Sequence, residues 1–522
     1  MDRASASDIY GTFIAFLYLT PFLGGLLADR ILGYRKSIVA GGLLMAAGYM
    51  CLAIPDERAF YGALTLIIIG NGFFKPNIST LLGNLYSQPQ YQERKDSGFN
   101  IFYMGINMGA FVCNFFAAYL RHNFGWGYAF FAAGVGMVFG IIAFLMGVRH
   151  YRHADVLKPA QPQDAPLSRI FGVVLLPALV CSLIGWVYPG NIFGTDSTDA
   201  FIFGCIPVVA FYITLYSKAS KEDKRPLAAM LSIFAVVIVF WAVFKQNGTA
   251  LTTWAEFYTN RKIPEAIVAP AKSLKIVQSV NGKLDTVPKY DQQFRTSKDA
   301  NGKMIREVAV NPYLKNLPAN QKPAQGESLS LISTELFQSV NPFFVVILTP
   351  VVIAFFTFLR RRKKEPSTPS KIAFGLIISA VSTLIMVAAV SNCENGITKC
   401  NPWWLVSSYA VITIGELFLS PMGLSLVSKL SPPRFTALMM GGWFLATSIG
   451  NKLSGILATM WDKYDDKKNY FLVNFILLCI AAASIFFMLR WLKRIFEEHT
   501  FKNQEVNPAL TMHMEAELSE II

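Results

Sequence analysis

Long apolar runs, each followed by a short polar loop, recur along the whole chain. They are long enough for an α-helix to cross the hydrocarbon core of a bilayer, which takes about 20 residues. The pattern predicts an all-α polytopic membrane protein with about 13 transmembrane helices. Their approximate bounds are Asp8–Ala28, Ser37–Ile54, Phe60–Gly83, Phe99–Leu120, Trp126–Val148, Ile170–Tyr188, Phe201–Tyr216, Leu227–Phe257, Asn341–Leu359, Ile372–Val390, Trp403–Val427, Phe435–Met460 and Tyr470–Leu492.

One long polar segment, from Tyr258 to about Leu336, interrupts this pattern. It contains two Asn-Gly pairs, which begin at Asn281 and Asn301 and lie next to alternating apolar residues. Asn-Gly between such residues is typical of a tight β-hairpin turn. The segment is therefore predicted to be a small β-rich insertion, which either docks a partner or only decorates the fold.

Composition and charge agree with a membrane protein. Of the 522 residues, 53% are hydrophobic and only 15% are charged, which is too little charge for a soluble chain of this length. The net charge of +14 would indicate nucleic acid in a soluble protein, but here the basic residues lie in short loops, so no nucleic-acid partner is expected. Most basic loop residues fall on one side: Arg30, Arg35, Lys36, Arg94, Lys95, Arg149, Arg152, Lys158, Arg169, Lys218, Lys221, Lys224, Arg225, Arg360–Lys364, Lys371, Lys429, Arg434, Arg490, Lys493 and Arg494.

The positive-inside rule makes that side cytoplasmic. The prediction is a multi-pass protein of the cell membrane (inner or plasma) with a cytoplasmic C-terminus and an extracytoplasmic insertion. Lipid of the bilayer is then an expected partner.

The chain shows no pattern typical of an enzyme or a metal protein. Its seven cysteines lack metal-ligand spacing, its five histidines lie in loops or the tail, and no nucleophile–base cluster is visible. We therefore expect no catalytic residues, no metal and no cofactor. Cys393 and Cys400 flank a polar loop, and whether they form a disulfide or stay free is open at this level.

Few charges stand in the middle of a predicted span: Lys75, Lys245 and Glu416. A carboxylate there costs at least about 3 kcal/mol unless it faces a partner or a wet cavity. Because charged spans are rare in this chain, a functional Glu416 is favoured. The alternative is a neutral carboxyl that is hydrogen-bonded to a neighbouring helix.

Several segments, in order, resemble the proton-dependent oligopeptide transporter family of the major facilitator superfamily. They are Gly24–Lys36, Gly70–Asn77, Phe99–Phe111, Phe240–Phe244, Gln338–Pro342, Gly415–Pro421 and Gly442–Leu445. The resemblance covers nearly all of the chain outside the insertion. The two spans between Ile170 and Tyr216 match the extra helix pair of bacterial members.

The resemblance implies a division of the chain into two helix bundles with additions. These are an N-terminal bundle (1–148), a linker with the extra helix pair (149–225), a C-terminal bundle (226–257 and 337–495), the insertion (258–336) and a cytoplasmic tail (496–522).

The resemblance also implies roles for single residues. A zwitterionic peptide needs opposite charges a few ångströms apart, together with polar partners for its backbone. Glu416 is expected to take the peptide amino group, Lys75 to lie near its carboxylate, and Asn107 and Asn341 to bond its backbone. The pocket would be lined by Tyr18, Trp241, Ser420 and Trp443. For each aromatic residue, lipid contact or core packing remains the alternative.

Two further groups follow from the resemblance. Proton coupling or gating is expected to involve Glu416, Lys75 and Lys245. The turn that contains Asp29, Arg30 and Arg35 is expected to form a cytoplasmic gate.

The chain departs from the family pattern at two places. The acidic and basic motif of the family's first helix is missing, so we expect the natural protein to begin upstream, with 14 helices in all. Lys245 stands where the family usually places an acid that pairs with the residue at Lys75. Two lysines that face one cavity repel each other, unless Lys245 pairs with an acid of the missing helix.

The leading prediction is a secondary active transporter that imports di- and tripeptides with protons by alternating access. One alternative is a symporter of another small amphoteric or anionic solute, such as an amino acid, nitrate or a peptide-like drug. Another is a membrane receptor or binding protein that uses the insertion.

Overall fold

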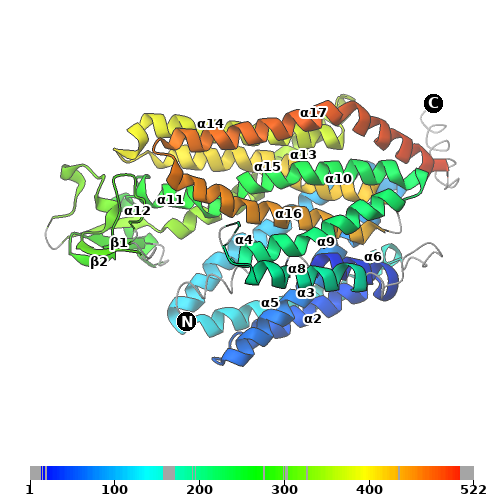
Figure 1. Cartoon of the computed structure of the whole chain (residues 1–522), viewed down its shortest axis with the longest axis horizontal. Coiled ribbons are helices and arrows are strands. Elements are labelled where there is room, and N and C mark those ends of the chain that lie inside the picture. The colour runs from blue at the N-terminus through cyan, green and yellow to red at the C-terminus, as the bar shows by residue number, and fades with distance from the viewer. Residues whose placement is uncertain are drawn as a thin grey trace.

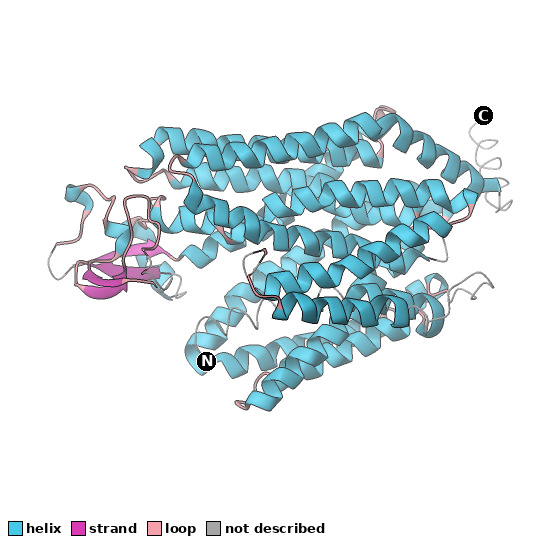
Figure 2. Cartoon of the chain, in the orientation of Figure 1, coloured by secondary structure: helices cyan, strands magenta, loops and turns pink. Residues whose placement is uncertain are grey.

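The computed structural model describes residues 13, 16–17, 20–156, 171–190, 192–193, 196–273, 277–297, 299, 304–324, 327–432 and 435–505. Most of these residues are helical, and the long helices run roughly along one axis (Figure 1). A small strand-containing segment lies at one end of the bundle, which we call the insertion end (Figure 2). At the opposite end, which we call the basic end, lie the last described part of the final helix, residues 28–36 and the connection 361–368 (Figure 1).

The first group of helices comprises residues 20–27 with the π-helix η1 (Ala28–Leu32), α2 (Tyr34–Cys51), α3 (Glu57–Leu85), α4 (Lys95–Phe124), α5 (Trp126–Met146) and the short α6 (Val148–Tyr151). Helix α2 packs against α3 and α5. At Gly41 a side-chain Cβ would lie 2.6 Å from the carbonyl oxygen of Gly70. Glycine at both positions therefore lets α2 and α3 approach to backbone contact.

A helix pair follows, formed by η4 (Phe171–Leu175) with α8 (Leu176–Val187) and by α9 (Asp196–Lys218). The Asp199 carboxylate accepts the backbone N–H groups of Ile192 and Phe193, both at 2.7 Å, and so fixes the turn between the two helices. The Tyr212 hydroxyl donates to the carbonyl of Leu438, which attaches α9 to the second group of helices.

The second group comprises α10 (Lys221–Phe244), η5 (Lys245–Gly248), α11 (Ala250–Phe257), α13 (Phe337–Arg361), α14 (Thr368–Asn392), α15 (Pro402–Leu430), α16 (Thr436–Thr459) and α17 (Lys467–Glu505). Helix α14 packs against α15 and α17, and α10 packs against α16 and α17. The two groups meet where α4 contacts α13 and α15, and where α3 contacts α15 and α16. We call them the N-half and the C-half.

Within the described ranges, eight helices are long and apolar enough to cross a membrane, and Gly172–Val187 is a shorter apolar helix. The run predicted over Leu227–Phe257 is broken into α10, η5 and α11. The chain is thus mostly helical with several candidate spans, while the number of thirteen stays a prediction.

The polar segment between α11 and α13 folds into α12 (Glu265–Ser273) and four short strands, β1 (Val277–Asn281), β2 (Asp285–Pro288), β3 (Arg306–Ala309) and β4 (Ser328–Ile332). Strand β1 pairs antiparallel with β4, and β2 pairs antiparallel with β3. The hairpin expected at Asn281 is therefore wrong, because the strands on its two sides do not pair with each other. The Asn-Gly pair at Asn301 lies outside the described residues.

A small apolar core explains this pairing. Alternate residues of β1 and β4 point to one side and pack with the turn that follows β3: Val280, Leu329, Leu331, Tyr313, Leu314 and Leu317. Burial of this set outweighs the local preference of Asn-Gly for a hairpin.

Tyr313 also joins this core to the first residues of the insertion and to the loop that precedes α15. Its hydroxyl accepts the backbone N–H of Arg261 at 3.0 Å. Two cations lie near its ring, with the Arg261 guanidinium 5.0 Å and the Lys399 Nζ 3.7 Å from the ring centroid. Burial, together with the like charge of Arg261, lowers the pKa of Lys399 to about 6.

A disulfide joins Cys393 to Cys400 in the loop between α14 and α15. The Cys400 N–H donates to the Tyr258 carbonyl at 2.7 Å, and the Asn260 N–H donates to the Cys400 carbonyl at 2.8 Å. The bridged loop therefore lies against the start of the insertion.

Candidate functional site

Glu416 lies in the middle of α15 and is only 2% exposed. One carboxylate oxygen accepts the hydroxyl of Tyr103, from α4 of the N-half. The other accepts the side-chain amide of Asn341, from α13 of the C-half, at 2.8 Å. The same amide nitrogen is 2.9 Å from the hydroxyl oxygen of Thr413. The carboxylate is thus held by hydrogen bonds from both halves.

Tyr103 was not among the residues predicted from the sequence. Its signal was nevertheless present, because it lies four residues before Asn107 and so on the same face of the helix. The side-chain amide of Asn107 donates to the Tyr103 carbonyl at 3.0 Å, one turn back along α4.

The two mid-span lysines lie against aromatic rings of the C-half. Lys245 follows the end of α10, and its Nζ is 5.7 Å from the Trp241 ring centroid and 5.8 Å from that of Phe244. Its charge attracts the Glu416 carboxylate through space. Lys75, on α3, has its Nζ 4.8 Å from the Phe444 ring centroid. Each cation is thus placed over an aromatic face, an arrangement that stabilises a poorly hydrated ammonium.

Two of the residues predicted to line the pocket have a buried polar atom that is unused. The Trp241 Nε1 and the Ser420 Oγ have no hydrogen-bond partner within the described part of the chain. Leaving such a group unpaired costs about 1 to 3 kcal/mol, so both atoms are available to a polar ligand or to water.

Trp443 is placed differently. It is 2% exposed, its ring packs directly on Gly423 of α15, and it meets Phe234 edge to face at 6.1 Å. This is core packing between α10, α15 and α16. Tyr18 lies outside the described residues.

The predicted gate turn connects the two halves at the basic end. The Asp29 carboxylate, 3% exposed, accepts the backbone N–H groups of Ala437 and Leu438 at the start of α16, at 3.0 and 3.2 Å. Its other oxygen accepts the Tyr34 hydroxyl at 2.8 Å. An anion at a helix N-terminus is favourable because unpaired N–H groups and the helix dipole both face it.

The two arginines of this turn lie in different places. The Arg35 Nε lies 3.7 Å from Asp155, within the N-half. Arg30 lies on η1, on the same turn as Asp29.

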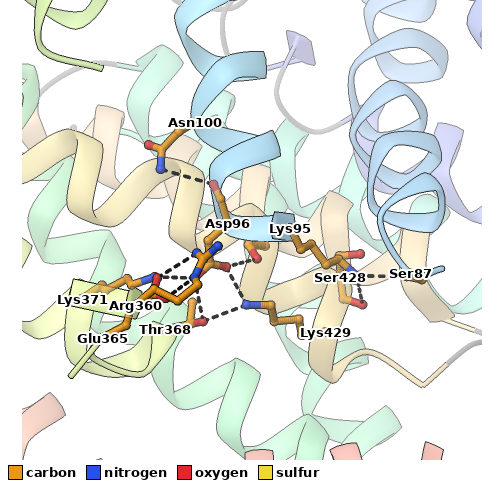
Figure 3. Close-up of polar contacts among 11 residues, drawn as sticks. Ser87, Lys95, Asp96, Asn100, Arg360, Glu365, Thr368, Lys371, Ser428 and Lys429 are labelled. Atoms are coloured by element: carbon orange, nitrogen blue, oxygen red, sulfur yellow. Dashed lines mark hydrogen bonds and ion pairs between the residues drawn. The ribbon is translucent and has the colours of Figure 1, made fainter. Parts of the chain in front are cut away.

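A second cluster of charges, centred on Asp96, lies at the basic end (Figure 3). Asp96 stands in the first turn of α4, and its side chain is 9% exposed. Its carboxylate contacts Lys371 of α14 at 2.7 Å and Lys429 of α15 at 2.6 Å. It also accepts the hydroxyl of Ser425. An acid of the N-half is therefore bound by bases of two C-half helices.

A second acid of this cluster belongs to the C-half. Glu365 contacts Lys371 at 2.6 Å and forms a two-pronged ion pair with Arg360. Burial raises the pKa of Glu365, but the hydrogen bonds from Arg360 and Lys371 outweigh burial and lower it. Lys371 thus lies between an acid of each half.

Close packing accompanies these contacts. The Lys95 Nζ donates to the Ser428 carbonyl of α15 at 3.3 Å. A Cβ on Gly83 of α3 would lie 2.1 Å from the Ser428 hydroxyl oxygen, so any larger residue would separate the halves here. In the sequence the lysines of this region look only like loop charges, because nothing in their spacing reveals a partner some 330 residues away.

Comparisons with known proteins agree with this architecture. The profile of the POT family matches residues 35–281 and 326–473, leaving out a stretch inside the insertion. A di-/tripeptide transporter of Lactococcus lactis subsp. cremoris is 30% identical over 464 residues, which are 87% of this chain and 80% of the relative. The peptide transporter YePEPT of Yersinia enterocolitica subsp. palearctica serotype O:3 (strain YE-P4) is 27% identical over 512 residues, which are 95% of this chain and 87% of the relative.

Solved structures give the same result. The crystal structure of peptide transporter POT in complex with sulfate matches with a TM-score of 0.61 at 25% identity, over 95% of this chain and 88% of that chain. A POT family transporter in complex with 5-aminolevulinic acid matches with a TM-score of 0.62 at 23% identity, over 95% of this chain and 89% of that chain, and shows the shared fold.

Proposed function

This chain belongs to the POT family, and from that premise we propose that it imports di- and tripeptides together with protons by alternating access. The observation that carries the proposal is Glu416, a buried mid-span carboxylate that receives hydrogen bonds from both halves. A peptide ammonium can replace one of these donors, since a carboxylate has several acceptor positions.

The proposed site lies around Glu416 between the two halves. Glu416 takes the peptide amino group, and Lys75 the carboxylate end. The Trp241 Nε1 and Ser420 Oγ, which have no hydrogen-bond partner among the described residues, supply polar contacts for the peptide backbone. Tyr103 joins the residues proposed from the sequence, and Asn341 orients the Glu416 carboxylate.

We assign the basic end to the cytoplasm on the ground of the positive-inside rule, which makes the C-terminus cytoplasmic and the insertion extracytoplasmic. Contacts of Asp29 and Asp96 with the C-half join the halves at this end. The structure then corresponds to a form that is closed towards the cytoplasm, from which import requires these contacts to break. Glu416 is the proposed proton carrier, because it is the acid that the sequence places in the middle of a predicted span.

The test is uptake of labelled dialanine into proteoliposomes under an inward proton gradient. Glu416→Gln removes the charge and keeps the shape, so one charge-assisted hydrogen bond to the ammonium is lost. That loss is worth about 1.5 to 3 kcal/mol, or roughly a 10- to 150-fold weaker affinity. Glu394→Gln, on an exposed loop at the insertion end, is the matched control and should transport normally.

Normal dialanine uptake by Glu416→Gln would refute the proposed role of Glu416. If neither the wild type nor Glu416→Gln transports dialanine, and the wild type binds a single amino acid, the substrate is another amphoteric solute.

A further inference from the structure

The place where the insertion meets the loop before α15 holds two cations whose hydrogen-bond acceptors are uncharged. Arg261 is 2% exposed, and its Nη1 donates to the side-chain oxygen of Gln278 at 3.0 Å and to the Ile332 carbonyl at 2.6 Å. The Lys399 Nζ donates to the Phe257 carbonyl at 2.7 Å. In the part of the chain that the structure describes, neither cation forms an ion pair with a carboxylate.

One donor of this place is unused. The Arg261 Nε is buried and has no hydrogen-bond partner among the described residues. A guanidinium stays charged and carries five N–H donors in a fixed plane, so this N–H cannot turn away to find an acceptor. Because a buried donor of a charged group is costly to leave unpaired, the Nε–H is available to an acceptor from outside the chain.

The two positive charges act on one place. The Arg261 guanidinium and the Lys399 Nζ lie 5.0 and 3.7 Å from the same ring centroid, that of Tyr313. We call these three residues the Tyr313 junction. Like charges beside one buried ring repel each other, since little water is present to screen them. The repulsion contributes to the lowered pKa of Lys399.

The chain compensates these charges only in part. Helix α11 ends here, with the Phe257 carbonyl bonded to Lys399 and the Glu256 carbonyl 3.5 Å from the Arg261 Nη2. The end of a helix supplies a negative charge of about one half. The Glu256 carboxylate also attracts Arg261, but this side chain is exposed and water screens it. Of two positive charges, roughly one therefore remains beside the ring.

We propose that the Tyr313 junction binds a small monovalent anion of the halide class, such as chloride. The Arg261 Nε–H donates to the anion, and the Lys399 ammonium attracts it. One negative charge matches the positive charge that remains. The anion joins the insertion to the disulfide-bridged loop, because Arg261 belongs to the insertion and Lys399 to that loop. This inference does not depend on which solute the protein transports.

A water molecule is the alternative occupant. The Asn316 Oδ1 also has no partner within the described ranges, and its Nδ2 donates at 3.1 Å to the same Phe257 carbonyl that accepts Lys399. A water that accepts from Arg261 and donates to Asn316 would satisfy both atoms. It would leave the positive charges of Arg261 and Lys399 uncompensated, and for this reason the charges favour an anion.

The direct test uses bromide, which resembles chloride and scatters X-rays anomalously. The full chain is crystallised in a bromide salt at about pH 6, where about half of the Lys399 side chains are charged. The expected result is an anomalous peak within hydrogen-bond reach of the Arg261 Nε. A water at this position without an anomalous peak would overturn the proposal.

Hydrogen exchange tests the same site in solution. The amides of Asn260 and Ile332 bond to the carbonyls of Cys400 and Arg261, so their exchange reports opening of the junction. Their rates are compared in sodium chloride and in sodium gluconate at equal ionic strength. An anion with a Kd of about 15 mM should slow their exchange about tenfold at about 150 mM chloride.

Variants locate the effect. Lys399→Met removes one of the two charges and should lose most of the slowing by chloride, whereas Lys399→Arg keeps the charge and should retain it. Lys315→Met is the matched control. The Lys315 Nζ also donates to carbonyls, those of Tyr290 and Asp291, and lies 5.6 Å from the Phe294 ring centroid, but at an exposed position. This variant should respond to chloride as the wild type does.

Equal exchange rates of the wild type in chloride and gluconate would overturn the proposal. Full slowing in Lys399→Met, or its loss in Lys315→Met, would also overturn it, because chloride would then act elsewhere. If Lys399→Met does not fold, the bromide map of the wild type decides alone.

Discussion

Tyr313 joins the core of the insertion to Arg261, among the first residues of the insertion, and Tyr313→Phe changes this junction by a single oxygen atom. The side chain is 2% exposed, and its hydroxyl is the acceptor for the backbone N–H of Arg261. Phe keeps the ring, so the contacts with the Arg261 guanidinium and Lys399 remain. The change leaves one buried N–H without its acceptor, which costs about 1 to 3 kcal/mol.

Local opening can be measured by hydrogen exchange of the amides whose bonds involve Arg261 or residues within three positions of it, which we call the attachment amides. They bond as follows: Asn260 to Cys400, Cys400 to Tyr258, Ile263 to Ser330 and Ile332 to Arg261. A loss of about 1 to 3 kcal/mol should accelerate their exchange by roughly 5- to 150-fold. The amides between β2 and β3 lie away from Tyr313 and should exchange as in the wild type.

Tyr61→Phe, on an exposed ring of α3, serves as the control variant and should leave every rate unchanged. Unchanged exchange at all four attachment amides in Tyr313→Phe would refute the reasoning. Equal acceleration across the whole insertion would show that the Tyr313 hydroxyl supports the entire insertion and not only the residues around Arg261.

Three further predictions concern charge and covalent links. Lys399 has a pKa of about 6 in the folded protein, below its ordinary value. Between about pH 6 and pH 10 the unfolded chain therefore binds more protons than the folded chain, and the free energy of unfolding should rise with pH. Thermal melts at pH 5, 7 and 9 should show this rise, and Lys399→Met should flatten it. The Cys393–Cys400 disulfide closes a loop across a separation of seven residues, and its reduction should lower the free energy of unfolding by about 2.5 kcal/mol. Reductant should therefore lower the melting temperature of the wild type and leave that of a Cys393→Ser/Cys400→Ser variant unchanged. Lys245→Met removes a cation that competes with the peptide amino group for Glu416. For an attraction of about 1 kcal/mol, KM for dialanine uptake should fall roughly fivefold. An unchanged or higher KM would contradict this competition.

Some features of the site could be predicted from the sequence because they depend on the composition of one span. Glu416 is conspicuous as an acid in an apolar run, and Lys75 and Lys245 are conspicuous in the same way. The partners of these charges could not be predicted. Tyr103 resembles any interfacial aromatic residue until its hydroxyl is found on Glu416. Trp443, expected in the pocket, packs on Gly423 because a glycine at that position of α15 leaves room for an indole.

The insertion shows the same limit at the level of secondary structure. Its Asn-Gly pair at Asn281 predicted a local hairpin, but β1 pairs with β4 because their buried faces share a core with Tyr313. Turn preference is a local property, whereas burial depends on residues some fifty positions away along the chain.

The helical, polytopic architecture and the gathering of basic loops at one end of the bundle could both be predicted from the sequence. Each of these properties depends only on the residues within one span or one loop. Only the tertiary structure decided which charges meet. Asp96 looks like a loop acid in the sequence, yet it contacts bases on α14 and α15. The physical reason is that a buried charge depends for its stability on partners across the helix interface, and the packing of the two halves alone brings those partners within reach.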